Sequence, residues 1–503
     1  MSSKVLSAAV IGLDCELIEV EADTTLALPG ILIVGLPDKA VDESRERVRS
    51  AIKNSGFEMP RSKVTINLAP ADIKKEGPSY DLPIAISILL TSKQIDFAPT
   101  PQIFLGELAL DGHLRSVSGV LSVCLEARNR GIKDIFVPAE NAAEAGLVSN
   151  LNIYPVSHLR ELTNHLTGQK LIAPFVLSKN FDFKTESSFD MAYIKGQHHA
   201  KRALEIAVAG GHNILMSGPP GSGKTLLAKS LVSIMPEMTE EEILEVTRIY
   251  SVSGLLPGEK PLINFRPFRS PHHTASGVAL VGGGSFPKPG EITLAHRGIL
   301  FLDEFPEFSR NVLENLRQPL EDGIVTVSRA SGTLQFPAKF ILVAAMNPCP
   351  CGYSTDPDKS CICMPYKIIN YQKKISGPLL DRIDLHVEVP KVKFENLIDE
   401  LPAESSQSIR QRISRARQIQ GERFKEMKIL TNSEMDSRQV KKYCAVDDKS
   451  LGLLRQAVSK LNLSTRSYFR VLKLARTIAD LSESPEIKFD HVAESLQYRP
   501  KVE

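Results

Sequence analysis

The chain has 503 residues, enough for about three domains of ordinary size, with 42% hydrophobic and 24% charged residues. Its 61 lysines and arginines against 59 aspartates and glutamates leave a formal charge of only +2. This near balance excludes a histone-like protein that binds nucleic acid over its whole surface, so any nucleic-acid contact has to come from locally concentrated charge.

Apolar segments of the chain are too short for a membrane span. The apolar run at residues 82–90 contains Pro83 and Ser87 and has about half of the required length. At the N-terminus, the apolar residues 8–13 are followed directly by acidic residues and by no cleavage-site pattern, which argues against a secretory signal. We therefore expect a cytoplasmic protein that does not contact a membrane.

The first part of the chain, residues 1–167, predicts a domain of mixed strands and helices. Residues 30–35 read as a buried strand, and residues 41–56 have the spacing of an amphipathic helix. Residues 64–68 alternate as a strand does, and residues 134–138 look like another core strand. An α+β domain is therefore expected here.

Three further regions follow. Residues 168–189 are polar and irregular, which is typical of a linker. Residues 190–390 run through helix, apolar strand, glycine-rich loop, helix and further strands, the pattern of an α/β domain with a largely parallel sheet. Residues 391–503 are helical and rich in Arg and Lys. The expected fold class is α/β, with an N-terminal α+β domain and a C-terminal helical domain.

A short apolar strand at residues 213–216 leads directly into the sequence GPPGSGKT and then into an apolar helix. This order is typical of a Walker A loop, in which backbone N–H groups and the helix N-terminus surround phosphate oxygens. In that pattern Lys224 reaches the β- and γ-phosphates of ATP and Thr225 binds Mg²⁺. The alternative, a glycine turn beside one surface lysine, does not explain the flanking strand and helix. The residues of the loop are Gly218, Pro219, Pro220, Gly221, Ser222, Gly223, Lys224 and Thr225.

Two further apolar strands end in polar residues. The strand within residues 298–304 ends in Asp303 and Glu304, and we expect Asp303 to hold Mg²⁺ and Glu304 to polarise the attacking water. The strand at residues 340–345 is followed, after one methionine, by Asn347, whose amide would orient that water. Alone, these polar residues could equally start a turn. The Walker A loop upstream favours the catalytic interpretation.

This arrangement of polar residues on successive strand ends resembles the AAA+ ATPases, a fold class that binds ligands at the carboxyl ends of parallel strands. Within that superfamily, residues 268–284, 289–296 and 375–385 resemble the magnesium chelatase I branch. From about residue 4 to residue 500, the chain resembles the YifB/ComM family of competence proteins, which are described as ring-forming DNA branch-migration helicases.

The resemblance implies a homo-hexameric motor that uses ATP and Mg²⁺ and acts on single-stranded and branched DNA. It implies roles in homologous recombination and natural transformation, with recombination proteins as candidate partners. Two other functions stay open: a magnesium chelatase-type ATPase subunit that drives metal insertion with partner proteins, and a nucleotide-switched assembly scaffold. The resemblance also assigns the adenine pocket to residues before the first helix of the ATPase domain, namely Ile194, Gly196 and Gln197.

Two arginines match catalytic arginines of the superfamily. Arg382 matches the arginine finger that a neighbouring subunit presents to the γ-phosphate, and a local ion pair with Asp381 or Asp384 is the alternative. Arg466 matches the sensor 2 arginine of the C-terminal helical lid, with Arg470 as a neighbouring candidate. A cation in the first turn of a helix is unfavourable unless an anion is present, so a phosphate partner would explain Arg466.

The alternating residues 324–336 around the turn Ser-Arg-Ala-Ser-Gly predict a hairpin with Arg329 at its tip. In related ATPases such a hairpin projects into the pore of the ring, and residues 266–288 resemble a further pore insert of the same branch. Arg329, Arg269 and Lys288 are therefore candidates for DNA contact, although a lone arginine on a turn is more often a solvated surface residue. Six copies in a ring would form a basic collar with salt-sensitive DNA affinity.

The N-terminal region resembles the proteolytic domain of Lon, through residues 75–79 (KEGPS) and 106–121. The resemblance places a serine nucleophile at Ser79, but the lysine that would activate it falls on Leu121. A serine hydroxyl without a base is a poor nucleophile. We therefore expect a Lon-like fold without peptidase activity.

Four of the seven cysteines lie within a short segment, as two CxC pairs: Cys349, Cys351, Cys361 and Cys363. Four thiolates so close in sequence suit a tetrahedral structural zinc site, although the spacing is tighter than in the usual CxxC zinc knuckle. Reduced free thiols and disulfides stay as alternatives, the latter disfavoured in the cytoplasm.

Overall fold

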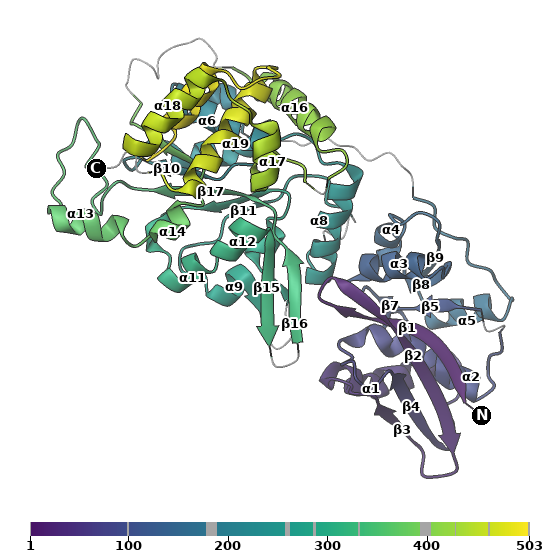
Figure 1. Ribbon diagram of the computed structural model, residues 1–503. Coiled ribbons are helices and arrows are strands. Elements are labelled where there is room, and N and C mark those ends of the chain that lie inside the picture. Colours follow the sequence, from purple (N-terminus) through teal and green to yellow (C-terminus); the bar gives the residue numbers. More distant parts are fainter. Residues whose placement is uncertain are drawn as a thin grey trace. The chain divides into compact units, whose positions relative to one another are not determined.

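The computed structural model describes residues 2–97, 100–177, 189–256, 262–284, 288–329, 332–392, 404–427, 429–460 and 463–500. The chain divides into two units, which Figure 1 shows from the N-terminus in purple to the C-terminus in yellow. The first unit comprises Met1–Asp182 and Glu240–Asn264, and the second comprises Phe183–Thr239 and Phe265–Glu503. Within the described residues, no helix combines the length and the apolar character that crossing a membrane requires.

A mixed seven-stranded sheet forms the centre of the first unit, in the order β3-β4-β2-β1-β5-β8-β9. The neighbours from β1 through β5 and β8 to β9 are parallel, whereas β2 is antiparallel to both β1 and β4. A separate short hairpin joins β6 (Glu107–Leu108) and β7 (Leu114–Arg115). The strands of the sheet are β1 (Ser3–Ile11), β2 (Asp14–Thr25), β3 (Gly30–Val34), β4 (Lys63–Ala69), β5 (Gln102–Phe104), β8 (Asp134–Pro138) and β9 (Asn152–Val156).

Helices cover both faces of this sheet. Along β1, Val5 and Ala9 belong to a core with helices α1 and α2, whereas Ala8 belongs to a second core with α3 and α4. This alternation follows from the two-residue repeat of a strand, which sends successive side chains to opposite faces. The helices of the unit up to the linker are α1 (Lys39–Asn54), α2 (Asp81–Thr91), α3 (Val120–Asn129), α4 (Ala142–Ala145) and α5 (Leu159–Leu166).

One expected core strand is an exposed edge strand. The expected strand at residues 30–35 is β3, which pairs only with β4 in the sheet order, and Leu32 and Val34 are 39% and 38% exposed. The expectation of a buried strand was therefore wrong, because an apolar run does not distinguish a central strand from an edge strand. The expected elements at residues 41–56, 64–68 and 134–138 are confirmed as α1, β4 and β8.

Residues 240–264 belong to the first unit, although their position in the sequence lies within the expected ATPase domain. They contain α8 (Glu240–Ser253), and Leu244 of α8 packs against the core around α3 and α4. The Ser251 hydroxyl donates to the buried Glu144 carboxylate and accepts a hydrogen bond from the Gly119 N–H at 3.1 Å. The Arg248 guanidinium donates to the Ser122 hydroxyl at 3.1 Å and to the Asp14 carboxylate at 3.2 Å. This helix is therefore an integral part of the first unit.

Replacing Ser251 by Ala is expected to weaken the packing of α8 by about 1–3 kcal/mol, because the buried Glu144 carboxylate and the Gly119 N–H each lose a hydrogen-bond partner. Burial already raises the pKa of Glu144, so the carboxylate tolerates little further loss of hydrogen bonding. Hydrogen-exchange mass spectrometry of the full chain should show faster exchange in α3 and α8. Ser253→Ala is the matched control, since the Ser253 hydroxyl donates to the Ile249 carbonyl within α8 at 2.7 Å. Equal acceleration in both variants would contradict the expectation.

The second unit contains a five-stranded sheet in the order β11-β14-β17-β10-β18, and all its neighbouring strands are parallel. The expected α/β class, with a parallel sheet and a C-terminal helical region, is confirmed. The strands of this sheet are β10 (Ile214–Ser217), β11 (Phe268–Arg269), β14 (Ile299–Leu302), β17 (Ile341–Met346) and β18 (Leu385–Glu388).

The C-terminal helices share a core with this sheet. Ile413 of α16 and Leu474 of α19 are buried together with residues of α6, α7 and the strands. A smaller core, which includes Phe424 and Val471, holds the remaining C-terminal helices together. The larger helices of the unit are α6 (His198–Gly210), α7 (Lys224–Ile234), α13 (Pro365–Gln372), α16 (Ser406–Arg423), α17 (Ser437–Tyr443), α18 (Asp448–Lys460), α19 (Thr465–Leu481) and α20 (Phe489–Gln497).

The expected hairpin is formed by β15 (Ile324–Arg329) and β16 (Gly332–Pro337), which are antiparallel. It follows directly after α12 (Arg317–Asp322) and extends away from the parallel sheet of the unit (Figure 1). A second, shorter hairpin joins β12 (Gly282–Gly283) and β13 (Lys288–Pro289). Two hairpins therefore lie in the part of the chain where pore-lining segments are expected.

Candidate functional site

The carboxyl ends of three neighbouring strands carry the polar residues of the candidate site. In the sheet β17 lies between β14 and β10, and both pairings are parallel, so the three strands end at one edge. The glycine-rich loop follows β10, Asp303 follows β14, and Asn347 follows β17. The structure thus brings together the residues that the sequence places at separate strand ends.

The glycine-rich loop turns sharply between β10 and α7. Gly221 and Gly223 have φ angles of +78° and +91°, a region that favours glycine. A Cβ atom on Gly218 would lie 2.1 Å from the Val389 carbonyl oxygen, so the close approach of the chain after β18 also requires glycine. This local geometry places Lys224 at the first residue of α7, where backbone N–H groups and the positive end of the helix dipole suit an anion.

The Lys224 ammonium lies inside the loop. It donates to the carbonyl oxygens of Gly218 at 2.7 Å and Pro219 at 2.9 Å, and to the Asn347 side-chain oxygen at 3.4 Å. Burial lowers the pKa of Lys224, and the nearby Asp303 carboxylate opposes this effect. The structure thus connects Lys224 with both other strand ends of the site.

Thr225 and Asp303 provide two hard oxygen ligands side by side. The Thr225 hydroxyl donates to the Asp303 carboxylate at 2.8 Å. Hydroxyl and carboxylate oxygens are the ligand types that Mg²⁺ prefers, usually together with waters and phosphate oxygens. The donor set therefore fits the expected magnesium site.

Glu304 has a partner that the sequence did not reveal. Its backbone is left-handed, with φ at +51°, and its carboxylate lies 3.0 Å from Nδ1 of His273, a contact that is an ion pair when the imidazole is protonated. His273 follows β11, the strand next to β14, and its ring also contacts Phe308 edge-on. From sequence, residues 266–288 resemble a pore insert, and the two-residue strand β11 was too short to signal another strand end at the site.

The expected adenine-pocket residues flank the glycine-rich loop. Gln197 caps α6 with φ at +58°, and its amide donates to the Ser222 carbonyl at 3.4 Å and also to the Pro390 carbonyl. Gly196 has φ at +63°, and Ile194 is 7% exposed. These three residues therefore lie on the segment that contacts the loop.

Arg382 and Arg466 converge on a single carboxylate. Both guanidinium groups form ion pairs with Glu321 of α12, and Arg382 is 5% exposed. Burial alone would raise the pKa of Glu321, but the two guanidinium groups hold it below its usual value. Arg470 instead pairs with the buried Asp384. From the sequence, Asp381 or Asp384 was the expected local partner of Arg382. Glu321, which lies far away in the chain, was not predicted.

The candidate DNA-contacting residues differ in their surroundings. Arg269 forms a bidentate ion pair with Glu291, with two contacts of 2.6 Å. Lys288 is exposed on β13. Arg329 is the last residue of β15, and the tip of that hairpin, residues 330–331, lies outside the described residues.

The two residues at the Lon-like positions lie in different environments. Ser79 is half-buried in a short 3₁₀ helix (Pro78–Tyr80). Leu121 is fully buried in α3, within the core around α3 and α4. Lys75, four residues before Ser79, is fully buried, and its ammonium donates to the Pro70 carbonyl.

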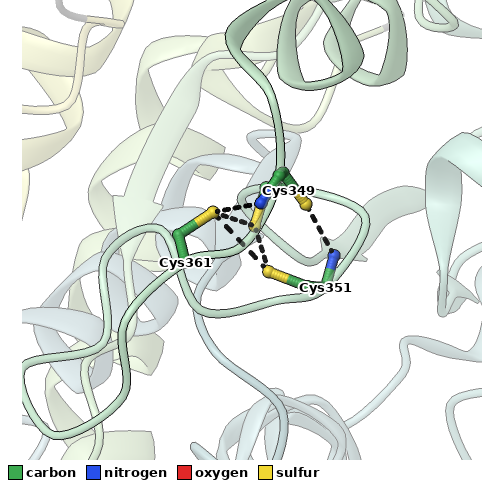
Figure 2. Close-up of side chains that lie close together, drawn as sticks. Cys349, Cys351 and Cys361 are labelled. Carbon is green, nitrogen blue, oxygen red and sulfur yellow. Dashed lines mark hydrogen bonds between the residues drawn. The ribbon is translucent and has the colours of Figure 1, made fainter.

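The four clustered cysteines come together in space. Figure 2 shows the side chains of Cys349, Cys351 and Cys361 converging. The Sγ–Sγ distances are 3.4 Å for Cys349–Cys351, 3.7 Å for Cys349–Cys361 and 3.6 Å for Cys351–Cys361. The fourth thiol, Cys363, accepts a hydrogen bond from the Cys351 N–H at 3.4 Å, and all four sulfur atoms lie within 4.8 Å of one another.

Comparison with known proteins places the chain among magnesium chelatase-related sequences. Family models match residues 190–397 (magnesium chelatase, subunit ChlI), 20–141 (subunit ChlI of Mg-chelatase) and 403–499 (magnesium chelatase, subunit ChlI C-terminal). The competence protein ComM of Haemophilus influenzae is 45% identical over 99% of this chain and 97% of its own. The uncharacterized protein YifB of Escherichia coli is 42% identical over 99% of this chain and 97% of its own. The magnesium-chelatase subunit ChlI of Bigelowiella natans is 24% identical over 44% of this chain and 60% of its own.

Proposed function

We propose, since the chain belongs to the YifB/ComM family of magnesium chelatase-related AAA+ proteins, that it is an ATP-driven motor. It assembles as a homo-hexameric ring and moves single-stranded or branched DNA, as branch migration in homologous recombination and natural transformation requires. The observation that carries the ATPase assignment is the convergence of Lys224, Thr225, Asp303 and Asn347 at one edge of a parallel sheet.

Each residue of this group has a distinct role in the proposed hydrolysis. Lys224 and the loop N–H groups bind the β- and γ-phosphates, while Thr225 and Asp303 hold Mg²⁺, which supplies positive charge to the phosphates when it is bound. Glu304 accepts a proton from the attacking water, and Asn347 orients that water. His273 orients the Glu304 carboxylate through the 3.0 Å contact of its Nδ1 atom.

The arginine pair supports a shared active site. Arg382 and Arg466 hold the same carboxylate of Glu321, so one chain presents both cations together. A γ-phosphate carried by a neighbouring copy can replace Glu321 as their anionic partner, since it too is an oxygen anion that accepts several hydrogen bonds. The ring is therefore proposed as the active form of the enzyme.

The alignment with ComM and YifB over nearly the full chain favours the DNA motor over a chelatase-type subunit. Those relatives align over nearly the whole chain, whereas the magnesium-chelatase subunit of Bigelowiella natans aligns over 44% of it. The N-terminal domain alone does not discriminate, because a family model for subunit ChlI matches residues 20–141. In the ring, hairpin β15–β16 with Arg329 and the exposed Lys288 would contact the DNA backbone.

The deciding experiment is three-stranded DNA branch migration with the purified full chain, with and without ATP, together with its ATPase rate with and without DNA. We expect ATP-dependent strand exchange and a DNA-stimulated ATPase rate, both absent in Lys224→Ala. An ATPase rate indifferent to single-stranded and branched DNA would support the chelatase-type alternative. Nucleotide binding with negligible turnover would support the assembly scaffold.

Replacing His273 by Ala is expected to lower kcat by about tenfold, less than the 10²- to 10⁴-fold loss that follows removal of a general base. The Glu304 carboxylate would lose its contact with the imidazole and sample more orientations, while phosphate binding by Lys224 should be unaffected. Steady-state kinetics should therefore show a lower kcat with little change in KM. His272→Ala is the matched control on the adjacent ring. A rise in kcat would show that His273 instead holds Glu304 away from the water.

The Lon-like domain is expected to show no peptidase activity, because Leu121 occupies the position of the activating lysine and lies in an apolar core. Casein and peptide hydrolysis should stay at background with ATP present. Peptide turnover that Ser79→Ala abolishes would overturn this expectation and would imply that a residue other than Leu121 activates Ser79. We propose that this domain serves assembly or substrate contact.

A further inference from the structure

We propose that Cys349, Cys351, Cys361 and Cys363 bind one structural zinc ion, and that this metal site holds the adjacent wall of the nucleotide site in place. Metal binding is inferred from the cysteine geometry alone. Only the second part, the coupling to nucleotide, rests on the proposed ATPase function.

The sulfur spacing fits one shared metal ion. A tetrahedral site with Zn–S bonds of about 2.3 Å has its sulfur atoms about 3.8 Å apart. The three Sγ–Sγ separations among Cys349, Cys351 and Cys361 lie between 3.4 and 3.7 Å. A disulfide would require about 2.05 Å. The geometry therefore favours one metal ion bound by all of these sulfur atoms over disulfide bonds between them.

The ligand set selects the metal. Thiolates are soft ligands that favour Zn²⁺ and exclude Mg²⁺ and Ca²⁺, and four protein ligands close the coordination sphere as in structural zinc sites. Backbone N–H groups support the sulfur atoms: that of Cys351 donates to Cys363 and that of Cys363 donates to Cys361, both at 3.4 Å. Such hydrogen bonds stabilise the thiolate form that a metal requires.

The segment that carries the cysteines needs a constraint of this kind. Between the end of β17 at Met346 and the start of α13 at Pro365, the chain has neither helix nor strand. Long loops without secondary structure are uncommon in folded domains unless a functional role or another tether orders them. Two CxC pairs near the ends of this loop would tether it through one ion.

The tethered loop touches both the glycine-rich loop and Asn347. Gly352, next to a metal ligand, has φ at +85°, and a Cβ atom there would lie 2.6 Å from Cδ of Pro220 and 3.8 Å from Cγ of Asn347. Cys349 follows Asn347 by only two residues, and its carbonyl accepts a hydrogen bond from the Gly352 N–H at 2.9 Å. The turn at residues 349–352 is therefore held by two metal ligands on one side and packs against the phosphate loop on the other.

Metal content tests the site itself. Protein expressed and purified without added zinc should contain about one equivalent of zinc per chain by plasma mass spectrometry, and Cys361→Ser should fall below about half an equivalent. Cys444→Ala, a buried cysteine outside the cluster, should keep its metal. Exchange with Co²⁺ should give the absorption bands of a tetrahedral thiolate site in the wild type and in Cys444→Ala. Wild-type protein with less than about half an equivalent, and without cobalt bands, would overturn the metal site.

Gly352→Ala tests the coupling separately, because it keeps all four thiols and places a methyl group against Pro220. We expect full zinc content but an affinity for a fluorescent ATP analogue reduced by about tenfold or more, comparable with the loss in Cys361→Ser. Gly421→Ala on α16 is the matched control, since a Cβ there meets nothing within 4 Å. Wild-type nucleotide affinity in both Gly352→Ala and Cys361→Ser would overturn the coupling. Failure of the wild type to bind the analogue would overturn the proposed function instead, and the zinc content would still decide the metal site.

Discussion

Replacing Glu304 by Gln is expected to lower kcat for ATP hydrolysis by about 10²- to 10⁴-fold while ATP still binds, because the amide cannot accept the proton of the attacking water. The residues that bind the phosphates and Mg²⁺, Lys224, Thr225 and Asp303, are untouched by this change. Single-turnover hydrolysis and equilibrium binding of a fluorescent ATP analogue measure the two effects separately.

Glu307→Gln is the matched control for this variant. Glu307 lies three residues further on in the same connection and forms an exposed ion pair with Lys374 at 2.9 Å. The Glu307→Gln variant should retain wild-type hydrolysis, since an exposed ion pair contributes little to stability. Glu304→Gln should also still form rings with ATP but lose branch migration. Full strand exchange by Glu304→Gln would rule out hydrolysis as the source of movement.

Replacing Arg382 by Ala is expected to lower ATP hydrolysis by about 10³-fold or more, as removal of an arginine finger does in other phosphoryl-transfer enzymes. Because Arg382 is buried and pairs with Glu321, Arg382→Lys is measured beside it: the lysine keeps the charge but loses the planar, bidentate geometry. Arg317→Ala serves as the control, since Arg317 pairs with Glu314 at 2.9 Å on an exposed surface.

Mixed assemblies then show whether the finger acts on a neighbouring copy. Lys224→Ala and Arg382→Ala should each be inactive alone. In a randomly mixed ring, about a quarter of the interfaces combine an intact lysine from one copy with an intact arginine from the next. Recovery of activity on mixing supports a shared site. Persistent inactivity of well-folded mixtures, or full activity of a monomer, would contradict it.

The glycine-rich loop could be predicted from the sequence because it depends on the order of neighbouring elements along the chain. A strand, a glycine-rich turn and a helix in succession fix the positions of Lys224 and Thr225 with little help from the rest of the chain. The same holds for Asp303 and Asn347, which follow apolar strands. Parallel pairing then brings these strand ends together, as the structure shows.

The missed features depend on contacts between residues far apart in sequence. His273 reaches Glu304 because β11 and β14 are neighbours in the sheet, and β11 spans only two residues. Glu321 lies on α12 and Arg382 lies in the turn after α14 (Gly377–Leu380), and nothing in either local pattern predicts that pair. An edge strand and a central strand can also share the same apolar sequence and differ only in their place in the sheet. For this reason β3 was expected to be buried, although it lies at the edge.

The cysteine cluster could be predicted from the sequence only in part. Its composition and spacing could be read from sequence, and they left zinc, free thiols and disulfides open. The separations among the sulfur atoms narrow that choice, since they match a shared ion and exceed a disulfide bond. The contact of Gly352 with Pro220 had no counterpart in the sequence pattern.

The location of α8 has a consequence for any attempt to separate the two units. The chain passes between them three times, after residues 182, 239 and 264, so a single proteolytic cut after residue 182 leaves both fragments joined by the contacts of α8. A truncated protein that begins at residue 189 would expose Leu244 and leave Ser251 without Glu144. Loss of activity in such a truncation would therefore report an uncovered helix as much as a missing domain. Deleting residues 240–264 at the same time removes this ambiguity.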